Sequence, residues 1–495
     1  MLFNSFPYLF LFFPIVLAGF YILGYVFPDK NWHKVWIAIA SLYFYAYWEI
    51  SYLWLISASI LCNYGLSLQF PKPKKRPKKK EVSYRRLLLG VGMVFNLGLL
   101  GYYKYADFFL GTVNTLAKTH FEPLNIILPL AISFFTFQQI AYLVDCAKGE
   151  VADRSFLNYL VFVTFFPQLI AGPIVHHKEM MPQFASKVLH HINYQNFALG
   201  LSIFALGIFK KVIIADSFAI WANEGFAQAA ALGTMEAWRT SLSYTMQLYF
   251  DFSGYTDMAI GSALFFNIKL PFNFNQPYLA LSIQDFWARW HITLSRFLKD
   301  YIYIPLGGSR GGEWKTYRNI FLVFFVSGLW HGAGWTFVFW GVMHGLAMWI
   351  HRAWKSVGGE LPKPLAWFIT FNFVNIGWVF FRATSFEQAL QVLRAMFGLA
   401  TAPPSGALFT WPESIGAWMP ILTQPFDHSW IFYGLPFLLG SLVVALPILW
   451  GSTSDAEKFM KRFKPSPLFA LVTISMLVAA LMSMHKASEF LYFNF

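Results

Sequence analysis

Two histidines lie inside strongly hydrophobic sequence, where ionisable side chains are rare. His331 follows Phe-Phe-Val-Ser-Gly-Leu-Trp, near the end of a hydrophobic run that starts after Arg318. His291 lies 40 positions earlier, within Phe-Trp-Ala-Arg-Trp-His-Ile-Thr. An ionisable side chain at membrane depth costs about 2.5–3.5 kcal/mol for the most polar types, so it is usually retained for a function. Because histidine is well suited to moving a proton near neutral pH, the two positions predict proton-transfer chemistry inside a membrane.

These histidines have two interpretations. His331 lies 13 residues after Arg318, which is about 20 Å along a helix and near or just beyond the middle of a bilayer core. As a general base it would deprotonate a hydroxyl so that the oxygen attacks a thioester. His291 would then orient it, bind the donor or polarise a carbonyl. In the structural alternative, each imidazole hydrogen-bonds a backbone carbonyl in a helix bundle, and the residues alone leave both interpretations open.

The composition is that of a polytopic membrane protein. Hydrophobic residues make up 57% of the 495 positions and charged residues 12%, against about 25% charged in a typical soluble domain. The net charge of +13 indicates cytosolic loops and not nucleic-acid binding, since the aromatic residues are dispersed in apolar runs. Cys62 and Cys146 show no paired spacing and are expected to be buried thiols.

The hydrophobic segments predict the fold. About 20 apolar residues span a bilayer core roughly 30 Å thick. We therefore predict an all-α polytopic protein of about 11–13 membrane helices, some re-entrant or interfacial, in a single membrane-embedded domain over residues 1–495. The candidate segments are Tyr8–Phe27, Val35–Trp48, Tyr52–Gln69, Leu87–Tyr103, Leu124–Val144, Tyr159–Ile174, Phe197–Ile214, Leu242–Phe266, Ile320–Trp330, Trp335–Ile350, Leu365–Phe381, Ile431–Leu449 and Leu468–Met484.

The distribution of basic residues predicts the orientation. The lysine-rich run Pro71–Lys80, followed by Arg85 and Arg86, belongs in the cytosol by the positive-inside rule. Counting back through three spans places the N-terminus outside. Four basic residues between Lys458 and Lys464 indicate another cytosolic loop, whereas the proline-rich segment Thr401–Ser429 is predicted to be an external loop.

A polar stretch interrupts the hydrophobic pattern in the centre of the chain. Ser282–Tyr301 alternates aromatic and charged residues, which is typical of a helix at an interface or along a polar cavity. The turn Gly307–Gly312 follows, and its backbone amides could approach a phosphate. It lacks the GxxxxGK[ST] pattern of nucleotide-hydrolysing loops, and the alternative is a flexible cytosolic turn.

No metal site is predicted. The sequence contains no HExxH or HxH motif and no histidine-rich cluster. His344 lies 13 residues after His331, so the two imidazoles would face different directions on one continuous helix. His176 and His177 are expected in an interfacial loop.

Small and acidic residues set two further expectations. Gly334, Gly341 and Gly345 fall on one helix face, which would let a neighbouring helix approach closely. Asp251 and Asp257 lie in an apolar span, where carboxylates must be paired or protonated. Pairing with a central arginine is the favoured interpretation over acid catalysis.

Together, several motifs resemble the membrane-bound O-acyltransferases, in particular the alginate O-acetylase branch found in bacteria. The resemblance runs nearly end to end and is densest from Gln247 to Gly345. The matching stretches are Gln247–Gly261 (QLYFDFSGYTDMAIG), Phe274–Tyr278 (FNQPY), Phe286–Ser295 (FWARWHITLS), Leu298–Tyr303 (LKDYIY), Leu306–Arg310 (LGGSR), Gly328–Gly334 (GLWHGAG), Trp340–Gly345 (WGVMHG), Pro167–Pro173 (PQLIAGP) and the ending Phe490–Phe495 (FLYFNF).

The resemblance implies a many-helix fold with a central tunnel and assigns roles to residues. The family's invariant histidine matches His331, and its second common histidine matches His291. With a cytosolic acyl donor, the candidates to meet the phosphates of coenzyme A are Arg289, Arg296 and Arg310, since guanidinium groups bind phosphate bidentately. The aromatic candidates for donor binding are Trp290 and Trp330.

The resemblance also implies a reaction and partners. In this branch, acetyl groups from cytosolic acetyl-CoA, a substrate and not a resident cofactor, cross the bacterial inner membrane, so the outside N-terminus would be periplasmic. A periplasmic acetyltransferase partner then places them on an exported polysaccharide such as alginate. Peptidoglycan or cellulose O-acetylation and D-alanyl transfer to teichoic acid remain alternatives for the acceptor. A polysaccharide or lipid transporter is the alternative from a different class, although the chain shows no inverted repeat.

Overall fold

The computed structural model describes residues 1–71, 78–186, 189–399, 463, 465–484 and 491. Within these ranges every regular element is a helix, and no strand is present. The all-α prediction is confirmed. Several helix starts have serine or asparagine caps whose side chains accept a backbone N–H three residues later, as Ser155, Asn193 and Ser385 do.

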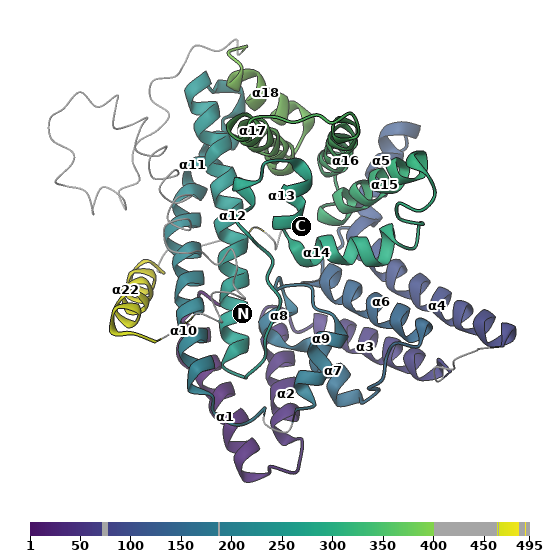
Figure 1. Ribbon diagram of the computed structural model, residues 1–495, viewed down its shortest axis with the longest axis vertical. Coiled ribbons are helices and arrows are strands. Elements are labelled where there is room, and N and C mark those ends of the chain that lie inside the picture. The colour runs from purple at the N-terminus through teal and green to yellow at the C-terminus, as the bar shows by residue number, and fades with distance from the viewer. Residues whose placement is uncertain (72–77, 187–188, 400–462, 464, 485–490, 492–495) are drawn as a thin grey trace.

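In the first part of the chain, α3, α4 and α7 pack against α6, whereas α1 and α2 pack against each other (Figure 1). Here η denotes a 3-10 or π turn. The elements are η1 (Tyr8–Phe12), α1 (Phe13–Val26), α2 (Trp32–Ala46), α3 (Tyr52–Gln69), α4 (Lys79–Leu100), η2 (Gly101–Tyr105), α5 (Ala106–Ala117), α6 (Ile132–Lys148), α7 (Phe156–Thr164), α8 (Phe166–Leu169) and α9 (His177–Phe184).

The second part contains the long helix α12 and the helices that carry the two histidines. Its elements are α10 (Tyr194–Phe209), η3 (Lys210–Ala215), α11 (Asp216–Ala227), η4 (Ala229–Ala231), α12 (Thr234–Leu264), η5 (Pro277–Leu279), α13 (Ile283–Arg289), α14 (Ile292–Leu298), η6 (Lys299–Tyr303), α15 (Glu313–His331), α16 (Trp335–Ser356), α17 (Lys363–Arg382), α18 (Phe386–Met396) and α22 (Pro467–Ser483).

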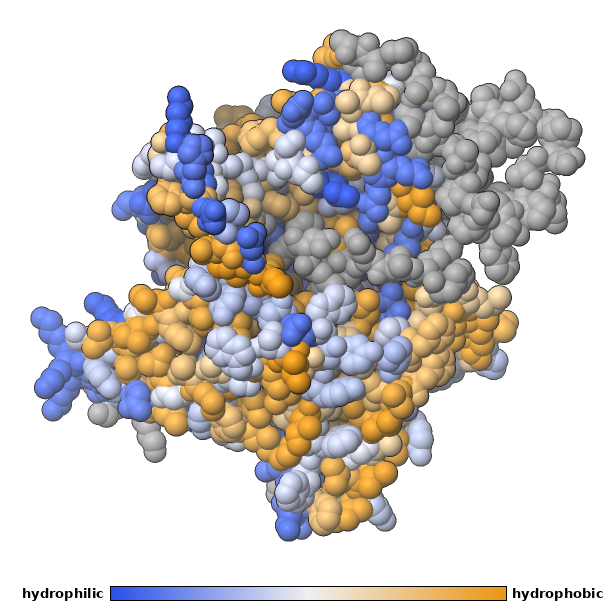
Figure 2. All heavy atoms as spheres, turned by 180° about the vertical axis from the view of Figure 1, so that it is seen from behind, coloured by the Kyte–Doolittle hydropathy of each residue, from blue (hydrophilic) through white to orange (hydrophobic). Residues whose placement is uncertain are grey.

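Four described helical runs are long and apolar enough to cross a membrane. They are Tyr8–Val26, Lys79–Ala117, Tyr194–Ala227 and Lys363–Arg382. Apolar residues cover much of the outer surface in Figure 2, which suits a protein surrounded by lipid. Cys146 is buried as expected, whereas Cys62 is exposed on α3, so that part of the cysteine prediction is wrong.

Three predicted segments are broken in the structure. Residues 124–131 are not helical, and α6 begins only at Ile132, after Ala131 in a left-handed conformation. The predicted span Tyr159–Ile174 ends as a helix at Thr164, and only the short α8 follows. The predicted helix Ser282–Tyr301 is broken into α13 and α14, with the π turn η6 directly after α14, because the backbone turns sharply between α13 and α14. The predicted span Ile431–Leu449 lies outside the described residues.

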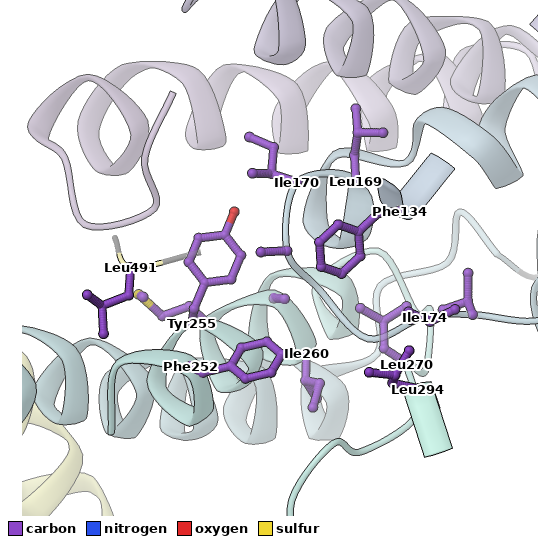
Figure 3. Packing of buried hydrophobic residues seen from close by; sticks show 14 of the residues in the cluster. Phe134, Leu169, Ile170, Ile174, Phe252, Tyr255, Ile260, Leu270, Leu294 and Leu491 are labelled. Atoms are coloured by element: carbon purple, nitrogen blue, oxygen red, sulfur yellow. The ribbon is translucent and has the colours of Figure 1, made fainter. Parts of the chain in front are cut away.

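Close backbone contact holds α10 against α12. A Cβ on Gly207 would lie 2.6 Å from the carbonyl oxygen of Gly254, and one on Gly261 would lie 2.7 Å from that of Gly200. These distances leave no room for a side chain, so the glycines let the two helices meet along their length (Figure 1). Residues of α6, α8 and α12, among them Phe134, Leu169 and Phe252, surround the adjoining core (Figure 3).

Helices α15 and α16 form a hairpin through a second close contact. A Cβ on Gly341 would lie 2.4 Å from the Phe324 carbonyl oxygen and 3.0 Å from the Gly328 Cα. Gly345 also faces Phe324, so the glycine-face prediction is confirmed for Gly341 and Gly345. It is wrong for Gly334, which precedes α16 and would meet only side-chain atoms.

We predict that Gly341→Val separates this hairpin. The new side chain would overlap the α15 backbone and lower the free energy of unfolding by about 1–3 kcal/mol or more. Denaturant titration of the detergent-solubilised protein measures the change. Gly90→Ala on α4 is the matched control, because a Cβ there meets nothing within 4 Å. Equal stability of the Gly341 variant and the control would contradict the close contact.

Candidate active site

His331 is the last residue of α15 and lies buried in a cage of aromatic rings. Its imidazole centroid is 5.0 Å from the ring of Trp330, 5.1 Å from Trp340 and 5.2 Å from Phe381. The Trp340 and Phe381 rings come from α16 and α17, and His331 is only 2% exposed. The hairpin contact at Gly328 and Gly341 brings α16 close enough for Trp340 to reach the imidazole.

His291 lies in the break between α13 and α14. Its backbone is left-handed, with φ of 43°, which is uncommon for a residue other than glycine and marks a constrained position. The segment around Asn273 holds this turn, because the Asn273 carbonyl accepts the Ile292 N–H at 2.9 Å and its side chain accepts the Thr293 hydroxyl at 2.6 Å. The imidazole is fully buried and packs 4.8 Å from the ring of Phe252.

One indole joins the two histidines. The ring of Trp330 is 5.0 Å from His331 and 6.0 Å from His291. His291 also interacts electrostatically with His331. The structure therefore brings together the two histidines that the sequence singled out, on separate elements 40 positions apart.

Buried polar atoms gather around His331. Trp330 Nε1, Trp340 Nε1, His344 Nε2 and Ser327 Oγ have no hydrogen-bond partner in the part of the chain that the structure describes. Buried polar atoms in folded proteins are almost always hydrogen-bonded, so a group of such atoms around one imidazole calls for an explanation. A polar ligand or substrate at His331 would satisfy them.

Two residues of this region were missed by the sequence analysis. His344 is fully buried beside Trp340, and its Nδ1 accepts the Trp287 indole N–H at 3.2 Å. The prediction that His344 faces away from His331 assumed one continuous helix, but the chain turns between α15 and α16. The glycines on either side of Ala333 were the signal in the sequence for this turn. The second is Lys104, whose ammonium reaches the Trp330 carbonyl oxygen at 2.5 Å.

The aromatic and basic candidates for donor binding are spread out. Trp290 is buried 4.9 Å from the ring of Trp378, away from the surface. Arg289 pairs with Asp285 at 2.7 Å. Arg296 pairs bidentately with Glu179.

Arg310 differs from the other two arginines. It is exposed in the glycine-rich turn before α15 and forms no ion pair with any described residue. Gly307, Gly308 and Gly312 of this turn have positive φ angles of 105°, 56° and 88°, which only glycine adopts readily. Of the three arginines, Arg310 is therefore the one that can bind a phosphate without displacing a carboxylate.

Asp251 and Asp257 pair with lysines and not with arginines as predicted. Asp257 accepts from Lys210 at 2.6 Å, and Asp251 lies 2.7 Å from Lys211. Lys211 also contacts Asp216 at 2.7 Å. The lysines belong to η3, next to α12, so neighbouring helices neutralise these charges locally.

His176 and His177 form an anchor with the buried Asp145. The loop prediction holds for His176, which precedes α9, and is wrong for His177, which is buried as the first residue of α9. Both Nε2 atoms contact Asp145 Oδ2, at 2.7 and 3.0 Å, and the Tyr301 hydroxyl donates to the same oxygen at 3.0 Å. These atoms are close enough to hold a metal ion. However, His176 Nδ1 accepts the Lys178 N–H at the start of α9, so a neutral His176 carries its proton on Nε2. A hydrogen-bonded anchor fits this tautomer, whereas a metal ligand does not.

Comparison with known proteins gives the family. The family model "MBOAT, membrane-bound O-acyltransferase family" matches residues 145–386, which include both histidines. A peptidoglycan O-acetyltransferase of Helicobacter pylori is 52% identical over 428 residues, covering 81% of this chain and 80% of the relative. This chain belongs to the membrane-bound O-acyltransferase family. It is an integral membrane O-acyltransferase, which confirms the resemblance seen in its motifs.

Other relatives in the family are less similar. A probable alginate O-acetylase of Pseudomonas aeruginosa is 41% identical over 407 residues, covering 81% of this chain and 76% of the relative. A teichoic acid D-alanyltransferase of Bacillus subtilis is 30% identical over 296 residues, covering 55% of this chain and 73% of the relative.

We predict that the anchor makes the enzyme sensitive to mild acid. Burial lowers the pKa of His177 below its ordinary value near 6.5, although the bond to Asp145 partly offsets this. The contribution of the neutral His177 to the stability of the folded protein is therefore fully present above about pH 6.5, and it declines as the pH falls below that value. The melting temperature of the detergent-solubilised protein, measured from about pH 7.5 to about pH 5.5, should fall less in His177→Gln than in the wild type.

Titration of Asp145 does not contribute to the change in melting temperature over this pH range. Burial acts to raise the pKa of its carboxyl group, but the hydrogen bonds from His176 and His177 outweigh burial and hold the pKa well below the usual range. Its contribution is therefore lost only at lower pH than the window measured. Parallel curves for the wild type and His177→Gln would contradict a buried neutral His177.

Proposed function

We propose that this O-acyltransferase accepts acetyl groups from acetyl-CoA on the cytosolic side of the bacterial inner membrane and delivers them for O-acetylation of an exported polysaccharide. The observation that carries the proposal is the pair of buried imidazoles at Trp330, close to buried polar atoms that have no hydrogen-bond partner among the residues the structure describes. An apolar, enclosed site of this kind excludes water, which would otherwise hydrolyse the thioester.

His331 is the general base in this proposal. It takes the proton of a hydroxyl that the partner enzyme presents, as that oxygen bonds to the thioester carbonyl carbon. The carbon–sulfur bond then breaks, and the proton passes from the imidazolium to the leaving thiolate. His291, which also contacts Trp330, orients the reacting groups, and the indole N–H groups of Trp330 and Trp340 are available to the carbonyl oxygen.

The direction of transfer follows from the charge distribution. The lysine-rich run Pro71–Lys80 and the turn with Arg310 face the cytosol, and the N-terminus is periplasmic. Helix α15 begins beside that turn and ends at His331, 19 residues or about 28 Å later. An acyl group that enters near Arg310 and reacts at His331 would therefore pass through most of a bilayer core about 30 Å thick.

A partner completes the reaction in this proposal. His331 is buried where a polymer could not easily reach it, so a periplasmic acetyltransferase collects the acetyl group and modifies the polymer. We expect the external loop Thr401–Ser429 and the aromatic ending Phe490–Phe495 to dock this partner, and both contain residues outside the described ranges. No soluble cofactor is needed beyond the donor itself.

Peptidoglycan is the favoured acceptor. The 52% identical relative is named a peptidoglycan O-acetyltransferase, whereas the relatives named alginate O-acetylases are 38–41% identical. Alginate, the first acceptor predicted from the motifs, is the second candidate because the relatives named alginate O-acetylases are less similar to this chain. D-alanyl transfer is less favoured, since the teichoic acid enzymes are 26–30% identical.

Proteoliposomes test this function. We predict that the reconstituted protein releases free coenzyme A from acetyl-CoA supplied on the side of the Pro71–Lys80 loop. It should acetylate peptidoglycan or alginate supplied on the other side only when a periplasmic acetyltransferase is added there. Protein-free liposomes are the control for spontaneous hydrolysis, and free thiol and polymer-bound acetyl ester are both measured.

Each outcome bears on a different part of the proposal. If no coenzyme A is released with the partner and polymer present, the proposal that acetyl-CoA is the donor is contradicted. Full acetylation of the polymer by the lone protein would contradict the division of labour. Donor use from the opposite side alone would contradict the orientation.

A further inference from the structure

Lys104 is a buried lysine within a candidate membrane span. It lies in η2, the π turn between α4 and α5 in the helical run Lys79–Ala117, and it is 9% exposed. An ionisable residue at such a position is costly and usually marks a function, and π turns are frequent at functional sites. The mechanism proposed above does not use this residue.

The partners of Lys104 are neutral oxygens. Its ammonium donates to the Trp330 carbonyl at 2.5 Å and to the Ser133 hydroxyl at 3.4 Å, and no carboxylate of the described residues forms an ion pair with it. The buried lysines of η3 behave differently, since Lys210 and Lys211 each pair with aspartates. The fold thus neutralises the two buried lysines of η3 with acids, whereas Lys104 is directed to the peptide bond before His331; buried Lys34 on α2 also meets a neutral oxygen, that of the Asn158 side chain.

Lys104 supplies a hydrogen-bond donor to a carbonyl group at the end of α15. The last four carbonyl groups of a helix have no donor within the helix. In α15, the Tyr105 hydroxyl donates to the Leu329 carbonyl at 2.7 Å, next to the bond from Lys104 to the Trp330 carbonyl. A positive charge at a helix C-terminus is also favoured by the helix dipole.

These two contacts lie directly beside the reactive residue. The carbonyls of Leu329 and Trp330 are the two that precede His331 along the chain. Holding them fixes the peptide plane that carries the imidazole and the direction of the Trp330 indole. Without these donors the last turn of α15 is free to fray, and a displacement of about 1 Å can slow an oriented reaction about 100-fold.

We propose that Lys104, together with Tyr105, is a positioning residue that holds the end of α15 so that His331 faces its substrate. The proposal rests on the acyl-transfer function proposed above. Lys104 acts through the α15 backbone and does not need to touch the acyl group. The π turn is what lets two consecutive side chains, Lys104 and Tyr105, reach consecutive carbonyls of one helix end.

The test separates positioning from folding. Release of coenzyme A is measured in proteoliposomes supplied with the periplasmic acetyltransferase and polymer, for Lys104→Met, Lys104→Arg and Tyr105→Phe, and rates are divided by the amount of folded protein. We expect Lys104→Met to lower kcat at least tenfold with KM for acetyl-CoA nearly unchanged. Lys104→Arg, which keeps a charged donor, should recover part of kcat, and Tyr105→Phe should lower kcat by severalfold without loss of stability.

Lys210→Met is the matched control for a buried lysine. It leaves Asp257 without its partner, so it should reduce the amount of folded protein while the folded fraction keeps normal kcat. A normal kcat per folded molecule in Lys104→Met would overturn the inference. If that variant does not fold, a normal kcat in Tyr105→Phe overturns it instead. A wild-type protein that releases no coenzyme A would contradict the proposed function and not the role of Lys104.

Discussion

The close contact between α15 and α16 is the constraint on which the candidate active site depends. Gly328 and Gly341 let the two backbones meet, so that the end of α15 lies against the start of α16. His331 is placed at this end, and Trp340 reaches its imidazole from the opposite helix. Any side chain at these glycines would push the helices apart and open the aromatic cage.

Neutralisation of charge is the second organising principle of this membrane protein. Lys210 and Lys211 are held by aspartates of the adjoining helical elements, which secures the packing of α12 against η3 and α11. Asp145 gathers two histidines and Tyr301 into an anchor between α6, α9 and η6. Around His331, several buried polar atoms have no hydrogen-bond partner among the described residues.

The sequence predicted the parts of this protein that depend on hydrophobicity and spacing. The apolar surroundings of His331 and His291 were enough to select both histidines, and Tyr52–Gln69 was predicted with the bounds that α3 has. The interruptions within the predicted helices were harder to predict. Pro129 and the left-handed residues Ala131 and His291 interrupt segments whose sequence is apolar or amphipathic throughout. Hydropathy alone does not distinguish a long helix from a helix that turns back.

The partners of individual side chains could not be read from the sequence. Asp251 and Asp257 were expected to meet arginines, but the register of η3 against α12 presents lysines to them. Arg296 was expected to be available to a phosphate, yet Glu179 lies 117 positions away in the chain and meets it in the fold. Lys104 carried no motif, since its role arises only from the π turn that aims it at α15.

The rate of acetyl transfer per folded molecule in His331→Ala tests the central claim most directly. The appropriate control is His33→Ala, since His33 is another buried histidine, in α2, that packs against Phe20 and His190. The account predicts that His331→Ala inserts and folds like the wild type but loses transfer by at least about 100-fold, as expected for removal of a general base, while His33→Ala retains transfer per folded molecule. Wild-type transfer by folded His331→Ala would contradict the account.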